Sequence, residues 1–131
     1  MGGFHGSIRK KGLPIYYSVD VYSERRANGI PVFNDSWKNV VATLYHELNE
    51  ARTDPDVGDA IRNANDPNSE RYLGWVSDRG EECGDYPIEE VQQISTIVKE
   101  VPLTDGSGTV PVQFQYSNAV HGPEGPISQP H

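Results

Sequence analysis

The chain has 131 residues, a length typical of one domain, and hydrophobic residues make up 35% of it, so we expect only a small core. Nineteen acidic residues against eleven basic ones give a net charge of −8, which argues against binding to a nucleic-acid backbone. No apolar run is long enough to span a membrane, the single cysteine Cys83 excludes an intrachain disulfide, and the first residues lack signal-peptide features. We therefore expect a soluble chain and leave its compartment open.

The first third of the chain predicts one strand between two loops. Residues 1–13 are rich in glycine and basic residues and are expected to form a loop. Residues 14–21 are β-branched and aromatic, which favours a strand. Residues 23–35 contain Asn-Gly and a proline and predict a second loop, which ends at a helix N-cap, Asp35 or Ser36.

The strongest helical pattern covers residues 36–53. At 100° per residue, one stripe is apolar, and we expect it to pack on a small sheet; it comprises Trp37, Val41, Leu44 and Leu48. The opposite arc is polar and comprises Asn39, Thr43, His46 and Glu50. We expect the helix to present His46, Glu47 and Glu50 to a cleft and to end just before Pro55.

The rest of the chain is rich in turns. Residues 57–64 are compatible with a short helix, residues 72–77 with a short strand or an extended segment and residues 78–87 with an acidic loop, while residues 88–103 leave helix and strand open. Residues 96–117 predict a hairpin that turns at Gly106-Ser107-Gly108. We therefore predict one α+β domain over residues 1–121 and a flexible tail over residues 122–131.

The string His46-Glu47-Leu48-Asn49-Glu50 carries the clearest chemistry. Positions i and i+4 of a helix are neighbours, so His46 and Glu50 can bind one cation, as the two histidines of HExxH do in zinc proteases. Carboxylate is an acceptable zinc ligand, although it lowers the selectivity for zinc over manganese or calcium. By itself the HExxE pattern is weak, because the same residues are typical of a solvated polar helix face.

Further carboxylates lie near this string. Thirteen of the nineteen acidic residues fall between positions 47 and 90. Asp54 follows the helix at i+8 from His46, on nearly the same face. The loop Gly80-Glu81-Glu82-Cys83-Gly84-Asp85 adds carboxylates from outside the helix, and its glycines let the backbone bend close to an ion.

Four separated motifs carry a resemblance to a known family. The strings HELNEARTDP, GW, GEECGD and VQFQYSNA, in this order, resemble a zincin-like family that includes uncharacterised bacterial proteins and the secreted plant phosphate-induced, exordium-like proteins. Gly3-Phe4-His5 is similar to the family's upstream aromatic-histidine pair, so the resemblance spans most of residues 3–119. Cys83 stands where the family has an aliphatic residue, and Pro87 where the plant members have a cysteine.

The resemblance implies a zincin-like fold, of which this chain corresponds to the C-terminal part. It implies that His46 and Glu50 are metal ligands, that Glu82 or Asp85 is the third ligand, and that Glu47 is the general base. Zinc is the expected ion, with calcium or manganese as alternatives, and a peptide or protein is the expected substrate.

The sequence adds three further candidates and leaves two other interpretations open. Asp54 is a candidate ligand, His5 an extra ligand or a group on the substrate side, and Asn118 a residue that holds substrate or braces the acidic loop. The chain is alternatively a non-enzymatic, metal-stabilised binding module or a degenerate relative. The resemblance supports the fold better than it supports proteolysis.

Overall fold

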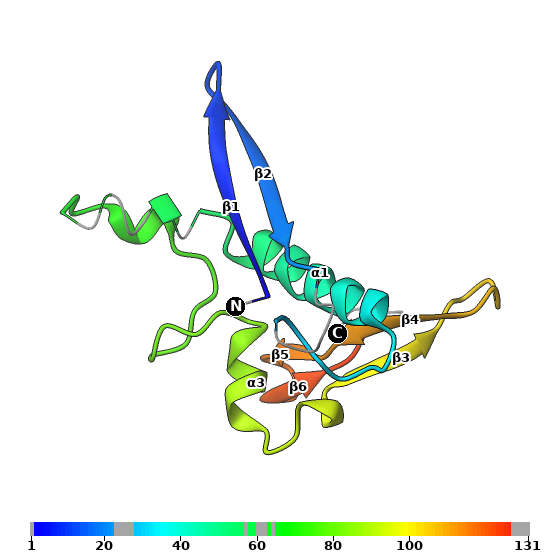
Figure 1. Cartoon of the computed structure of the whole chain (residues 1–131). Coiled ribbons are helices and arrows are strands. Elements are labelled where there is room, and N and C mark those ends of the chain that lie inside the picture. Colours follow the sequence, from blue (N-terminus) through cyan, green and yellow to red (C-terminus); the bar gives the residue numbers. More distant parts are fainter. Residues whose placement is uncertain (1, 23–27, 57, 60–62, 64, 127–131) are drawn as a thin grey trace.

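One long helix, three two-stranded antiparallel sheets and a few short helical segments make up the regular structure of the described residues (Figure 1). The computed structural model describes residues 2–22, 28–56, 58–59, 63 and 65–126. The strands are β1 (Gly3–Lys10), β2 (Leu13–Asp20), β3 (Val98–Pro102), β4 (Thr109–Gln113), β5 (Gln115–Ser117) and β6 (Gly122–Glu124). The helices are α1 (Ser36–Thr53) and α3 (Asp85–Glu90), with 3₁₀ turns at Ser69–Tyr72 and Ile94–Thr96. This arrangement confirms the predicted α+β, loop-rich class.

The N-terminal hairpin corrects the prediction of a loop over residues 1–13. β1 pairs with β2 along its whole length, from Gly3 opposite Asp20 to Lys10 opposite Leu13. Lys11 and Gly12 both have positive φ, 52° and 83°, which is the requirement of a two-residue hairpin turn that matches the strand twist. The hairpin extends away from the rest of the molecule, and its base contacts α1 (Figure 1).

Helix α1 has the predicted bounds, but the predicted packing of its apolar stripe is wrong. Trp37 and Leu48 are each 53% exposed and Leu44 is 45% exposed. The polar arc and the adjacent Glu47 are buried instead; the buried polar residues are Asn39, Thr43, His46, Glu47 and Glu50. α1 lies against β1, β2 and β4, and the buried polar residues contact β1 through Glu47 and β4 through His46.

Hydrogen bonds explain the burial of the polar arc. The Asn39 side chain accepts from the Phe33 N–H (2.8 Å) and donates to the Phe33 carbonyl (2.9 Å). The Thr43 hydroxyl accepts from the Ile30 N–H (3.3 Å) and donates to the Asn39 carbonyl (3.0 Å). Buried polar groups are tolerated when they are paired in this way. These contacts hold the segment before α1 against the small core, which comprises Ile30, Ala42, Ile97 and Val98.

The second half of the chain agrees only partly with the sequence pattern. The hairpin predicted over residues 96–117 is confirmed for β3 and β4, between Val98 and Gln113, whereas β5 pairs with β6 instead. The strand predicted over residues 72–77 is reduced to a single bridge between Val76 and Glu82. The acidic loop ends earlier than predicted, because α3 begins at Asp85. Around it, Trp75, Tyr86 and Tyr116 form an aromatic cluster.

Two other predictions concern the tail and the short helix. The start of the predicted flexible tail is ordered, because β6 pairs with β5 in the register Gln115 to Glu124. The short helix predicted over residues 57–64 lies largely outside the described residues. Among the residues that are described, no helix has both the length and the apolar character needed to cross a membrane.

Candidate functional site

A cleft of about 620 Å³ lies where the base of β1, the middle of α1 and the residues around the start of α3 meet. Ionisable side chains from all three segments line it. They are His5 from β1, His46, Glu47 and Glu50 from α1, and Glu82 and Asp85 from the acidic loop and α3. The cleft therefore gathers side chains that are separated by up to 80 positions in the sequence.

His46 is held by a chain of hydrogen bonds from β4. The Gln113 side chain is fully buried, and its Nε2 donates to the Gly84 carbonyl at 2.5 Å. A carbonyl only accepts, so Oε1 of Gln113 must face Nδ1 of His46, 2.8 Å away. Nδ1 of His46 therefore carries the proton and donates it. In the neutral ring, this arrangement leaves the lone pair on Nε2.

The Nε2 atom of His46 faces two carboxylates. It lies 3.2 Å from Oε2 of Glu50 and 3.6 Å from Oδ1 of Asp85. Ligand atoms bound at about 2.0–2.2 Å to one tetrahedral ion are separated by similar distances. The His46 triad, His46 with Glu50 and Asp85, is therefore spaced to hold a metal ion.

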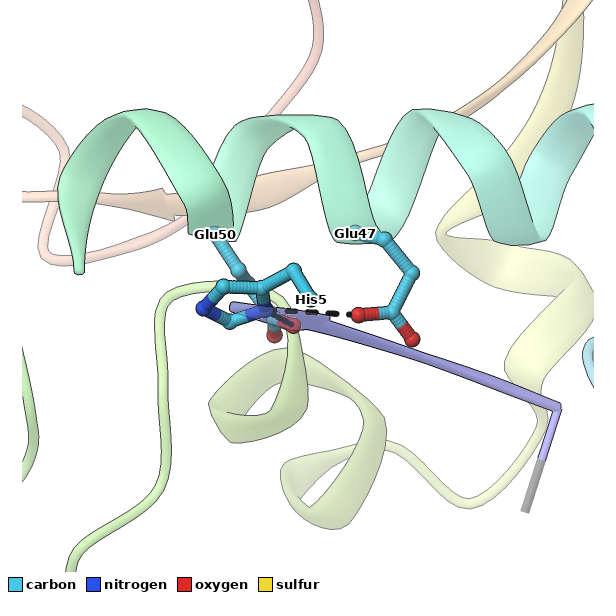
Figure 2. Close-up of side chains that lie close together, drawn as sticks. All are labelled: His5, Glu47 and Glu50. Carbon is cyan, nitrogen blue, oxygen red and sulfur yellow. Dashed lines mark hydrogen bonds and ion pairs between the residues drawn. The ribbon is translucent and has the colours of Figure 1, made fainter. Parts of the chain in front are cut away.

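His5 contributes a second nitrogen from the opposite side of the cleft. Its Nε2 donates to the Asp54 carbonyl at 2.9 Å, which fixes the ring and leaves Nδ1 facing the carboxylates. Nδ1 lies 3.4 Å from Oε2 of Glu47 and 3.8 Å from both Glu50 and Glu82. Figure 2 shows Glu47 and Glu50 extending from one face of α1 toward the His5 ring on β1.

In the metal-free cleft, protons bound to the histidines and to one glutamate offset the negative charge of the carboxylates. Burial lowers the pKa of His5 and of His46, but their hydrogen bonds and the charges of the carboxylates outweigh it and raise both pKa values to about 9. Burial and the charge of Glu50 raise the pKa of Glu82 to about 8. Burial raises the pKa of Glu50, but the hydrogen bond and the charge of His46 outweigh this effect and lower the pKa of that carboxyl. A bound cation would replace these protons.

The donors present fit a divalent cation. Glu50 is only 2% exposed, and its Oε1 atom is buried without a hydrogen-bond partner among the described residues. Buried carboxylate oxygens are normally paired, and a metal ion is one partner that satisfies them. Gly84 keeps the space around this atom open, because a Cβ there would lie 2.7 Å from it. Histidine nitrogen with carboxylate oxygen is a donor set that suits zinc.

The structure brings six of the eight candidate residues to the cleft and places two differently. Asp54 is fully buried, but its carboxylate accepts from the Gly74 N–H (3.0 Å), and it contacts His5 through its carbonyl. Asn118 lies exposed in the turn after β5 and does not line the cleft. Asp54 is thus placed to support the site, whereas Asn118 lies apart from it.

Sequence reasoning missed the residues that support the ligands. Gln113 is the last residue of β4 and is fully buried, and the signal in the sequence was a glutamine directly after the apolar residues 110–112. Gly3 lies against Glu47, since a Cβ on Gly3 would be 2.7 Å from Oε1 of that residue. Cys83 is buried, and burial raises the pKa of its thiol to about 11, which keeps it protonated.

No family model, curated protein or solved structure matches this chain in the comparisons made with known proteins.

Proposed function

We propose that this chain is a zincin-like metal-binding domain that hydrolyses a peptide or amide bond. The observation that carries the proposal is the fixed orientation of His46, whose Nε2 faces Glu50 at 3.2 Å and Asp85 at 3.6 Å. This spacing favours Asp85 over Glu82 as the third ligand in the His46 triad. The imidazole nitrogen favours zinc over calcium, which binds oxygen ligands.

Glu47 is the proposed proton acceptor. A zinc ion, when bound, acts as a Lewis acid and lowers the pKa of water. Glu47 follows His46 directly in the chain, is 5% exposed and lines the same cleft. His5 lies 3.4 Å from Oε2 of Glu47 and holds that carboxylate toward the cleft. Glu47 then takes a proton from the attacking water and passes it to the leaving amine.

A second candidate function is a metal-stabilised binding module without catalysis. Among the described residues, the apolar core cluster has four buried members, whereas α1 buries five polar or charged residues. Carboxylates buried this close together repel one another, so a cation would add directly to the stability of the fold. Both candidates use the His46 triad, and they differ in whether Glu47 turns over a substrate.

Metal content and thermal stability test the shared site. Wild type, His46→Ala and the control His121→Ala, which changes an exposed histidine outside the cleft, are dialysed against Zn²⁺ and analysed by mass spectrometry. Wild type and control should retain zinc and lose melting temperature when EDTA is added, and His46→Ala should retain less zinc and show a smaller loss. A wild-type chain that retains no zinc and melts identically with and without EDTA contradicts the proposal.

Turnover separates the enzyme from the module. Hydrolysis of a quenched-fluorescent peptide library is measured for wild type and Glu47→Gln, each loaded with Zn²⁺. The proposal expects Glu47→Gln to keep the ion at the His46 triad and to lose about 10²–10⁴-fold in rate, the typical contribution of a general base. Retained hydrolysis removes Glu47 from that role, and zinc binding without any hydrolysis favours the module.

A further inference from the structure

The metal-ligand atoms in the cleft form two triads rather than one. The first is the His46 triad of His46, Glu50 and Asp85. The second, the His5 triad, comprises His5, Glu47 and Glu50. In each triad the donor atoms all lie within 4.8 Å of one another, and each contains one histidine. The only residue common to both is Glu50. The described residues thus provide two neighbouring positions for a cation.

The two histidines are fixed independently. Gln113 holds the Nδ1 proton of His46, which directs Nε2 into the cleft, and the Asp54 carbonyl holds the Nε2 proton of His5, which directs Nδ1 into the cleft. Hydrogen bonds of this kind orient metal-binding histidines and set their tautomer. Each histidine therefore presents a nitrogen to its own set of carboxylates: the His5 nitrogen lies 3.4 Å from Glu47, and the His46 nitrogen lies 3.6 Å from Asp85.

Glu50 lies between these nitrogens. Its Oε2 atom is 3.2 Å from Nε2 of His46 and 3.8 Å from Nδ1 of His5. Its other oxygen, Oε1, is buried and has no hydrogen-bond partner in the described part of the chain, and the residue is 2% exposed. A carboxylate with one unsatisfied oxygen, placed between two nitrogen donors, has the chemistry of a bridging ligand.

We propose that the cleft binds two divalent cations, one at the His46 triad and one at the His5 triad, with the Glu50 carboxylate as their common ligand. The inference rests on the proposed metal site and adds a second ion, as in enzymes that use two metals. When this second ion is bound, Glu47 is its ligand, so the proton-acceptor role of Glu47 belongs to the form in which only the His46 triad is filled. The four carboxylates of the cleft, Glu47, Glu50, Glu82 and Asp85, balance two divalent ions in charge. Glu82 faces Nδ1 of His5 at 3.8 Å and completes the second position.

The test counts ions and measures whether they interact. Wild type, His5→Gln, His46→Gln and the control His121→Gln are loaded with Zn²⁺, and bound zinc is counted per chain. Wild type and control should bind two ions, and each of the other variants one. Glu47 variants are left out because Glu47 is also the proposed proton acceptor. Loaded with Mn²⁺, the wild-type chain should show the electron paramagnetic resonance spectrum of a coupled pair in place of the six-line spectrum of isolated ions.

The outcomes separate this inference from the proposed function. One ion per chain, lost in His46→Gln and retained in His5→Gln, overturns the pair and leaves the proposed single site intact. One ion that is lost in both variants overturns the pair as well, because both histidines then serve a single position. No bound ion at all overturns both proposals. The resonance experiment uses the wild-type chain alone, so isolated six-line signals at two Mn²⁺ per chain also overturn the bridge, even where a variant does not fold.

Discussion

The Oε1 atom of Gln113 lies 2.8 Å from Nδ1 of His46, and this contact joins β4 to the centre of the cleft. Because the same amide donates to the Gly84 carbonyl, Gln113 cannot rotate without breaking two hydrogen bonds. The orientation of a ligand on α1 is thus set by a residue 67 positions away in the sequence.

Gln113→Leu should weaken metal binding although Gln113 is not a ligand. Leucine has a similar volume but neither accepts from His46 nor donates to Gly84, so the imidazole loses its fixed tautomer. Loss of such a supporting contact typically lowers metal affinity about 10–100-fold, and a buried group left unpaired costs about 1–3 kcal/mol. Isothermal titration with Zn²⁺ and urea unfolding measure the two effects. The exposed Gln92→Leu serves as the control, and equal affinities of the two variants would contradict the role of Gln113.

Gly84→Ala should damage the site by steric contact alone. Gly84 has φ −88° and ψ −36°, which any residue adopts, so the backbone does not oppose the change. The added Cβ would lie 2.6 Å from Nδ1 of His46 and 2.7 Å from Oε1 of Glu50, and the imidazole must move. We expect Zn²⁺ affinity to fall at least about tenfold, which corresponds to about 1.4 kcal/mol. Gly122→Ala is the matched control, because its Cβ would have 3.9 Å to the nearest atom. Unchanged affinity in Gly84→Ala would show that the cleft is wider than described.

The pH dependence should have opposite signs for stability and for metal binding. In the metal-free chain the pKa values of His5 and His46 are raised from 6.5 to about 9, so the folded state binds these protons more tightly than the unfolded state. Their contribution to stability is complete below pH 6.5 and is lost as the pH rises through about 9. The raised pKa of Glu82, about 8, acts in the same direction. The melting temperature in EDTA should therefore fall between pH 6.5 and 9.

Zinc affinity should rise over the same pH range. The ion must displace the histidine protons, so each proton released adds about tenfold in affinity per pH unit below the histidine pKa. Titrations of Zn²⁺ at half-unit steps from pH 6.5 to 9 measure the slope. His5→Gln combined with His46→Gln should flatten both profiles. The raised pKa values of His5, His46 and Glu82 would be contradicted if the melting temperature in EDTA stayed constant or rose up to pH 9.

Local signals and long-range contacts account for what the sequence predicted and what it missed. The bounds of α1 were predicted correctly, because periodicity and the flanking Asp35 and Pro55 are local features. The hairpin of β1 was missed because its turn is Lys11-Gly12, and the lysine adopts a positive φ that few non-glycine residues take. The candidate ligands of α1 follow from helical spacing, whereas Gln113 does not, because its role depends on strand packing.

The same distinction explains the wrong face of α1. Helical periodicity separates an apolar stripe from a polar arc, but it does not say which one packs inward when the polar arc finds partners. Asn39 binds both backbone groups of Phe33, and Thr43 binds the Ile30 N–H. His46 binds Gln113. These partners are remote in sequence or lie in loops without a pattern, so the preference for burying the apolar stripe was the only signal available.

Two substitutions on α1 test this orientation directly. Ala42 is fully buried in the core cluster, whereas Leu44 is 45% exposed on the opposite side of the helix. Ala42→Leu should overpack the core and lower the free energy of unfolding by about 1–3 kcal/mol, while Leu44→Gln should change it by less than about 0.5 kcal/mol. Urea unfolding followed by circular dichroism, with EDTA present so that metal binding does not contribute, measures both. If the apolar stripe packed inward instead, Leu44→Gln would be the damaging change and Ala42→Leu the tolerated one. The pair therefore decides which face of α1 is buried without reference to the metal site.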